Sequence, residues 1–135
     1  MTNQERAEKL MVEASQIQKE LQDAIKGSTW NLAVRRAQEV IELVLKAILT
    51  EMGVDFPKIH DVAPLFRKVA IERGLLVDAS HLDWLEEVSA RLAMKRAPAF
   101  YFEAEVSENE AQEAAMAADR VLAFGSNFLK RLRGT

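Results

Sequence analysis

The segment from Arg96 to Phe102, RAPAFYF, holds the residues best suited to chemistry. A guanidinium stays charged at physiological pH and binds phosphate through paired hydrogen bonds, so Arg96 is a candidate phosphate ligand. Tyr101 follows five residues later and can donate a hydrogen bond, although a phenol of pKa ~10 is a poor base at pH 7. Alternatively, Arg96 only lies near the negative end of a helix dipole, with Tyr101 packed against it.

Three consecutive aromatic residues, Phe100, Tyr101 and Phe102, lie in the same segment. They cannot all face the core of a small helical protein, so we expect a contact with another protein, with Phe100 and Phe102 as candidate binding residues. A loop tucked under the helices and a stacking surface for a base are the alternatives. Nearby carboxylates would repel phosphates and count against the stacking surface: Glu103, Glu105, Glu108 and Glu110.

Glu42 and Lys46 are four residues apart in a strongly apolar stretch. Such a pair, with Glu first, stabilises a helix by roughly 0.2–0.5 kcal/mol, which is one interpretation. The other is that the two residues line an internal or interfacial binding site. His60 comes just before an expected helix start and is expected to bond to backbone or to a Glu, while His81 is expected at the surface. Two isolated histidines give no metal-site pattern.

The composition is typical of a soluble, helical protein. The 135 residues suit one domain, 1–135, and 49% are hydrophobic, 29% charged and few are Gly or Pro. The net charge of −3 does not indicate nucleic-acid binding over the whole surface. The lack of Cys excludes disulfides and thiolate metal sites. A polar N-terminus and the lack of ~18 consecutive apolar residues predict a cytoplasmic protein without a signal peptide or membrane span.

The element that must position these residues is a central helix over 30–52, WNLAVRRAQEVIELVLKAILTEM. Its apolar residues recur at steps of three and four and cover most of the helix surface. A helix this apolar should be surrounded by other helices on most sides.

Further helices are expected before and after it, at 4–25, from 62 to about 73, from 78 or 80 to about 95, and from 107 to about 132. Ser28 or Thr29, Asp61 and a Ser107–Glu110 capping box are the expected N-terminal caps. The dipeptide Ala97-Pro98 is expected to break helical structure. The sequence therefore predicts an all-α fold, an antiparallel four-helix up-and-down bundle with one short extra helix.

The ordered pattern resembles a known family. A helix that begins with Trp and contains AQEVIELVLKAIL is followed by a loop ending in His60-Asp61, a helix ending in Arg96, Tyr101, and a final Ala-rich helix. This pattern is similar to that of the HEPN domain, over nearly the full length.

The resemblance implies a homodimeric bundle, often partnered by a minimal nucleotidyltransferase as a toxin–antitoxin pair. Many members are metal-independent endoribonucleases with an Arg followed four to six residues later by His, in a cleft between the subunits. Arg96 matches the Arg, but Tyr101 stands where the His is expected. Because an imidazole titrates near neutrality and a phenol does not, the phosphate-binding half of the motif is kept and the base is missing.

Three functions remain open. The first is a toxin–antitoxin-type or nucleotide-linked accessory protein that acts by binding a nucleotide or RNA, without a cofactor, beside a nucleotidyltransferase. The second is an active endoribonuclease that uses Arg96 and Tyr101. The third is a dimerisation scaffold that binds no ligand.

Overall fold

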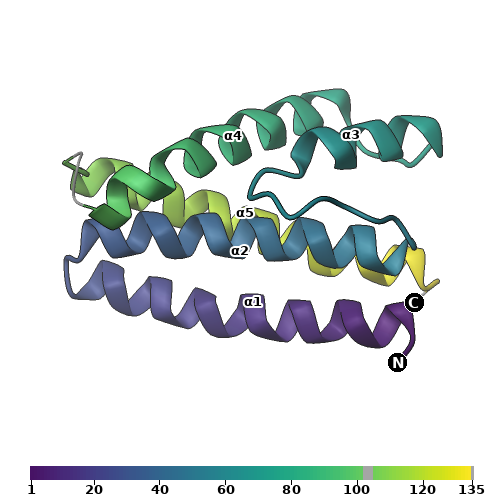
Figure 1. Cartoon of the computed structure of the whole chain (residues 1–135), viewed down its shortest axis with the longest axis horizontal. Coiled ribbons are helices and arrows are strands. Elements are labelled where there is room, and N and C mark those ends of the chain that lie inside the picture. Colours follow the sequence, from purple (N-terminus) through teal and green to yellow (C-terminus); the bar gives the residue numbers. More distant parts are fainter. Residues whose placement is uncertain (102–104, 135) are drawn as a thin grey trace.

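The computed structural model describes residues 1–101 and 105–134, with the side chains of Pro98, Phe100 and Tyr101 outside that description. It contains helices and no strand in these residues, so the expected all-α class is confirmed. The helices are α1 (Asn3–Lys26), α2 (Trp30–Glu51), α3 (Ala63–Glu72), α4 (Ala79–Tyr101) and α5 (Glu108–Leu132) (Figure 1). None of the described helices has the length and apolar character needed to cross a bilayer.

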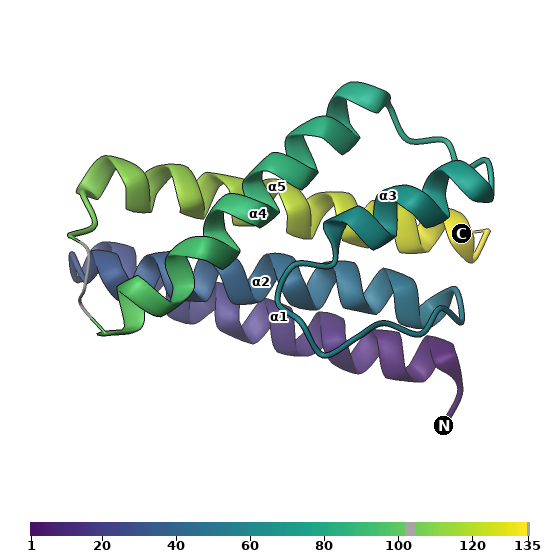
Figure 2. The ribbon, with the colours of Figure 1, turned by 45° about the horizontal axis from the view of Figure 1, so that its top comes forward.

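Helix α2 is the centre of the structure, as its apolar pattern predicted. It contacts α1, α3, α4 and α5. Its buried side chains form the middle of the core, among them Ile41, Val44, Leu45 and Ile48. Helices α1, α2 and α5 run side by side, whereas α4 is inclined to them (Figures 1 and 2). Because of this inclination, the regular four-helix up-and-down arrangement stays a prediction.

Thr2 caps α1 through a capping box with Glu5. A tight turn joins α1 to α2, and Gly27 is the C-cap residue of α1. Ser28 then takes a positive φ of 57°. Thr29 is the N-cap residue of α2, but its side chain makes no capping hydrogen bond, so the expected side-chain cap was wrong. Its backbone conformation (φ −93°, ψ 76°) differs from the extended one in which a hydroxyl reaches the helix amides.

Ser107 is the N-cap residue of α5 as predicted, whereas the N-cap residue of α3 is Val62 rather than Asp61. Asp61 Oδ1 accepts a hydrogen bond from the Ala63 amide (3.2 Å) at the start of α3. The same oxygen accepts one from Ser89 Oγ (2.7 Å), which fixes the start of α3 to α4. Ser107 Oγ accepts from the Glu110 amide (3.1 Å) at the start of α5.

The expected break of α4 at Ala97-Pro98 was wrong, because α4 continues to Tyr101. Proline removes one hydrogen-bond donor from the helix. Two contacts favour the last turn nevertheless. Ala99 is fully buried in the core, and its carbonyl accepts a hydrogen bond from Asn31 Nδ2 of α2 (3.2 Å). Carbonyls of a last helical turn lack partners within the helix, so Asn31 supplies one.

Candidate functional site

Arg96 points from α4 onto the side of α2. Its Nη1 donates a hydrogen bond to Gln38 Oε1 (3.0 Å) and lies 3.4 Å from Glu39 Oε2. The Arg96 side chain as a whole remains 30% exposed. These contacts with α2 differ from the alternative in which Arg96 only faces the carbonyl end of its own helix.

Gln38 connects Arg96 to the next polar residue on α2. The residue is 3% exposed, and its Nε2 donates to Glu42 Oε1 (2.8 Å) while its Oε1 accepts from Arg96. Since one end of an amide only donates and the other only accepts, the two neighbours fix its orientation. A buried amide with both ends bonded is rigid, and it holds the Arg96 guanidinium in one place.

Glu42 is the centre of the same network. It accepts hydrogen bonds from Lys46 Nζ (2.7 Å) and from Gln38, and lies 2.8 Å from His60 Nδ1. Burial alone would raise the pKa of Glu42, but the hydrogen bonds from Lys46, Gln38 and His60 outweigh it and hold the pKa below the ordinary 4.5. Glu42 and Lys46 are only 16% and 15% exposed, so they do not form a solvated surface pair.

His60 has the partner expected of it, a Glu. Its Nδ1 is occupied by Glu42, which leaves Nε2 as the ring nitrogen that can meet a ligand. The side chain is 56% exposed.

A second arm of the network leads to α1. Glu39 contacts Arg36 Nη1 (2.7 Å), and Arg36 Nε lies 3.5 Å from Glu20. Glu39 is therefore shared between two arginines. An anion that binds Arg96 would compete with Glu39 for the guanidinium, and Arg36 offers that carboxylate a second partner.

Together these contacts form a polar strip on α2, defined by Gln38, Glu39 and Glu42 with the attached Arg96 and His60. Gln38 and Glu42 are one helical turn apart, so Arg96 and His60 meet α2 about 6 Å apart along its axis. A cation that can hold a phosphate and an imidazole that can accept a proton thus share one face.

Sequence reasoning missed Gln38, the residue that joins Arg96 to Glu42. The signal was present, because Gln38, Glu42 and Lys46 recur every four residues on a helix that is otherwise mostly apolar.

Other predicted residues lie elsewhere or outside the description. The side chains of Phe100 and Tyr101, and the whole of Phe102, are not among the described residues. His81, expected at the surface, is partly exposed, and one side of its ring lies 4.5 Å from that of Phe124.

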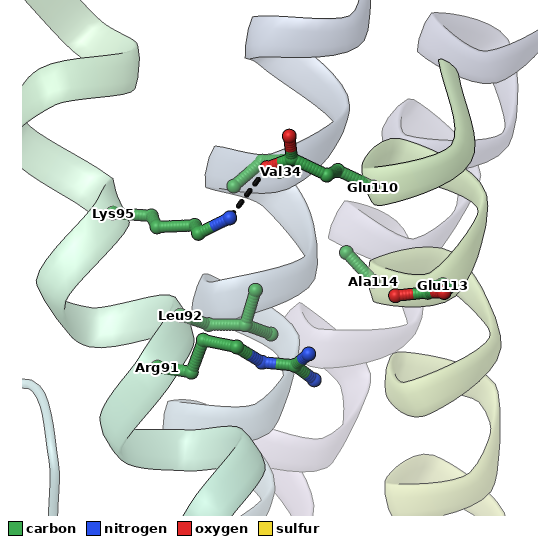
Figure 3. A pocket seen from close by; sticks show the side chains of 7 residues that line it. All are labelled: Val34, Arg91, Leu92, Lys95, Glu110, Glu113 and Ala114. Atoms are coloured by element: carbon green, nitrogen blue, oxygen red, sulfur yellow. Dashed lines mark hydrogen bonds and ion pairs between the residues drawn. The ribbon is translucent and has the colours of Figure 1, made fainter. Parts of the chain in front are cut away.

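In the part of the chain that the structure describes, no three His, Asp or Glu side chains gather to hold a metal ion. A small hollow lies between α4 and α5, where Lys95 of α4 pairs with Glu110 of α5 (Figure 3). Its volume of about 20 Å³ suits a single water molecule rather than a ligand.

Comparison with known proteins gives one match. The family model described as the HEPN domain matches residues 7–129, nearly the whole chain. No curated protein and no solved structure matches it.

Proposed function

Because the chain belongs to the HEPN domain family, we propose that it is an accessory protein that binds a phosphate-bearing ligand, a nucleotide or RNA, at Arg96. HEPN membership suggests a nucleotide- or RNA-related function. The observation that supports this site is the bond from Arg96 to the buried Gln38, made by a side chain that is still 30% exposed.

The network prepares Arg96 for binding. A free arginine side chain loses rotational freedom when it binds, and that loss lowers affinity. Here Gln38 and Glu39 already hold the guanidinium, so less freedom remains to be lost. The remaining N–H groups can form the paired hydrogen bonds that a phosphate accepts.

The proposal includes an assembly. HEPN domains commonly dimerise. We infer a single-domain, up-and-down helical bundle that pairs so that two copies of Arg96 line one cleft. A minimal nucleotidyltransferase, in a toxin–antitoxin-type pair, is the proposed protein partner.

Calorimetric titration with AMP, ATP, inorganic phosphate and a short single-stranded RNA tests the binding site. We expect Arg96→Ala to weaken the best of these ligands at least tenfold, since one charge-assisted bond is worth about 1.5–3 kcal/mol. Arg96→Lys should restore only part of the affinity, because Lys lacks the planar fork. Arg67→Ala is the matched control, because Arg67 pairs with Asp83 outside the strip. Equal affinity in Arg96→Ala and wild type contradicts the proposal.

His60 supports a second candidate function, metal-independent RNA cleavage. In this reaction the RNA 2′-oxygen attacks the adjacent phosphorus and its proton passes to His60 Nε2. Arg96 stabilises the phosphorane, and the bond from phosphorus to the 5′-oxygen then breaks. The 5′-oxygen takes a proton from water and leaves as a hydroxyl, which produces a 2′,3′-cyclic phosphate. The Glu42–His60 contact favours this candidate because a carboxylate bound at Nδ1 orients the imidazole ring and leaves Nε2 towards the ligand.

Incubating labelled RNA with the protein in the presence of EDTA distinguishes cleavage by His60, cleavage by Tyr101 and binding without cleavage. Cleavage lost in both Arg96→Ala and His60→Ala, but kept in Tyr101→Phe, supports the His60 mechanism. Cleavage lost in Tyr101→Phe and kept in His60→Ala supports Tyr101 instead. If the protein neither cleaves RNA nor binds any of the titrated ligands, the third function, a dimerisation scaffold, is supported instead.

A further inference from the structure

A groove runs between α5 on one side and α4 with the α3–α4 connection on the other. It consists of four hollows in a row: the first, of about 20 Å³, closes one end beside the Lys95–Glu110 pair, and the others have about 420, 370 and 250 Å³. Arg91 lines the first and second hollows, Arg120 the second and third, and Arg131 the third and fourth. The α5 residues that line them run from Glu110 to Leu132, which corresponds to a length of about 33 Å.

The groove exists because α4 packs on α2 and approaches α5 closely at few points. Figures 1 and 2 show α4 inclined to α5. The second hollow has a mostly apolar floor that includes Trp84, Val88 and Ala117, whereas the third is mostly polar. Met116 of the second hollow and Leu76 of the third and fourth are large apolar side chains that are 70% and 87% exposed.

Two arginines in the groove lie on aromatic rings instead of pairing with acids. The Arg120 guanidinium is 3.9 Å from the centre of the Trp84 ring, and that of Arg131 is 5.5 Å from the Phe128 ring. Within the described residues, neither forms an ion pair with a carboxylate. By contrast, other arginines have carboxylate partners: Arg36, Arg67, Arg96 and Arg133.

Arg120 and Arg131 are eleven residues apart, about three turns, so they lie on the same face of α5 roughly 16 Å from each other. The groove also contains acids, Asp78 near the third hollow and Glu113 near the second. In a chain of net charge −3, two cations without acidic partners on an exposed apolar floor form a locally positive binding surface.

We propose that this groove is the docking site for an amphipathic helix of a partner protein, with acidic residues beside its apolar stripe. An α-helix is about 10–12 Å in diameter, and a length of about 33 Å corresponds to roughly 22 of its residues. The apolar stripe covers Met116, Leu76 and Trp84, and acids about three turns apart reach Arg120 and Arg131.

The shape and charge favour a helix over other occupants. A small ligand would fill one hollow and leave the rest exposed. A nucleic-acid strand carries a negative charge at every nucleotide and would therefore meet Asp78, Glu110 and Glu113, whereas a helix can place acids only where they reach Arg120 and Arg131. The groove and the proposed phosphate site lie on different sides of α4, because Lys95 contacts α5 while Arg96 contacts α2.

The test uses a designed 22-residue helical peptide with leucines along one face and two glutamate pairs eleven residues apart. The readout is Trp84 fluorescence in a Trp30→Phe background, where Trp84 is the remaining tryptophan. We expect a saturable change that weakens at least tenfold in Arg120→Glu, in Arg131→Glu and in Met116→Asp. Lys68→Glu, at an exposed cation of α3, is the matched control and should leave the affinity unchanged.

Reversing the charges on both the peptide and the protein tests whether the acids of the peptide pair with Arg120 and Arg131. The same peptide with lysines in place of its glutamates should bind the Arg120→Glu, Arg131→Glu double variant at least tenfold more tightly than it binds wild type. Circular dichroism must show each variant folded. Where Arg120→Glu or Met116→Asp does not fold, Arg120→Gln or Met116→Gln replaces it, and the peptide is still expected to bind more weakly.

Three results would overturn the proposal. The first is peptide affinity that is equal in wild type and in all groove variants, or no binding to any of them. The second is a single-stranded RNA that binds wild type and loses affinity in Arg120→Glu while the peptide does not bind. The third is Met116→Asp converting a dimer into a monomer, which would assign the groove to a second copy of this chain.

Discussion

At the scale of single residues, Glu42 connects the proposed binding site at Arg96 to the stability of the fold. A carboxylate that is mostly shielded from water is unfavourable unless it is hydrogen-bonded, and Glu42 contacts three side chains. Lys46 balances its charge, Gln38 connects it to Arg96, and His60 attaches the α2–α3 connection. Removing the charge therefore affects the fold and the site together.

The first prediction concerns Glu42→Gln and pH. The folded-state pKa of Glu42 lies below the ordinary 4.5. Its contribution to stability is thus fully present above pH 4.5 and is lost as pH falls through the folded-state pKa. We expect Glu42→Gln to lower the free energy of unfolding at pH 7 by about 1–3 kcal/mol and to flatten its decline in acid.

Urea unfolding measured from pH 3 to pH 7 checks this. Glu13→Gln, at an exposed position of α1, is the control and should follow the wild-type curve. If the free energies of unfolding of wild type and Glu42→Gln fall in parallel from pH 7 to pH 3, the prediction is contradicted.

The second prediction concerns His81. Burial, followed by the charge of Arg120, lowers the pKa of His81 below 6.5, and Asp78 opposes this shift. His81 is therefore neutral at pH 7, and the stability that depends on its neutral form is lost as pH falls below 6.5. An NMR titration should show Arg120→Gln raising the midpoint and Asp78→Asn lowering it further. A midpoint above 6.5 in wild type would contradict the burial of this ring.

At the scale of elements, α5 depends on small residues where it approaches α2. A Cβ added at Gly125 would lie 2.2 Å from Val44 Cγ1, far inside contact distance, and Val44 is fully buried. The backbones of α2 and α5 can approach this closely because residue 125 has no side chain. Glycine here serves close packing rather than an unusual backbone conformation.

The third prediction follows from this approach. Alanine normally stabilises a helix interior by about 1 kcal/mol over glycine, yet we expect Gly125→Ala to lower the free energy of unfolding by about 1–3 kcal/mol. Combining it with Val44→Ala should cost less than the sum of the two single changes. Chemical denaturation measures all three variants.

Gly27→Ala is the control, because an added Cβ there comes no closer than 3.4 Å to a neighbour. Its effect should be small. An increase in stability in Gly125→Ala would show that α2 and α5 are not packed this closely.

At the scale of the whole molecule, the polar strip and the groove use different sides of α4. Arg96 faces α2, where the proposed two-fold cleft lies, while Lys95 faces α5. A homodimer formed at the strip would leave the groove available for a partner helix. The proposed ligand site, the proposed dimer and the proposed partner helix therefore do not compete for the same surface.

The fourth prediction tests the dimer. A residue beside a two-fold axis faces its own copy in the other subunit. The sequence contains no Cys, so Ala97→Cys introduces a single thiol next to Arg96. We expect oxidation to link Ala97→Cys chains into disulfide dimers, seen on a non-reducing gel. Lys68→Cys should remain unlinked, and equal linking of both variants would place the interface elsewhere.

The sequence by itself determined where the helices lie and what chemistry they carry. The observed bounds of α1 and α2 agree with the periodicity to within one residue at each end, and Ser107 caps α5 as predicted. These features are local, because a helix hydrogen bond joins residues four apart and a cap reaches two or three residues. The choice of Glu42 and Lys46 as candidates needed only their residue types and spacing, whereas that of Arg96 also depended on the resemblance to the HEPN domain.

Only the tertiary structure decided which of these groups meet. The last turn of α4 depends on a bond between Asn31 and Ala99, 68 positions apart, which no local pattern contains. Gln38 joins Arg96 to Glu42 because α4 lies across that turn of α2. The inclination of α4 both brings Arg96 to α2 and opens the groove along α5. The angle between two helices is set by how their side chains interlock, and a single helix's pattern does not contain it.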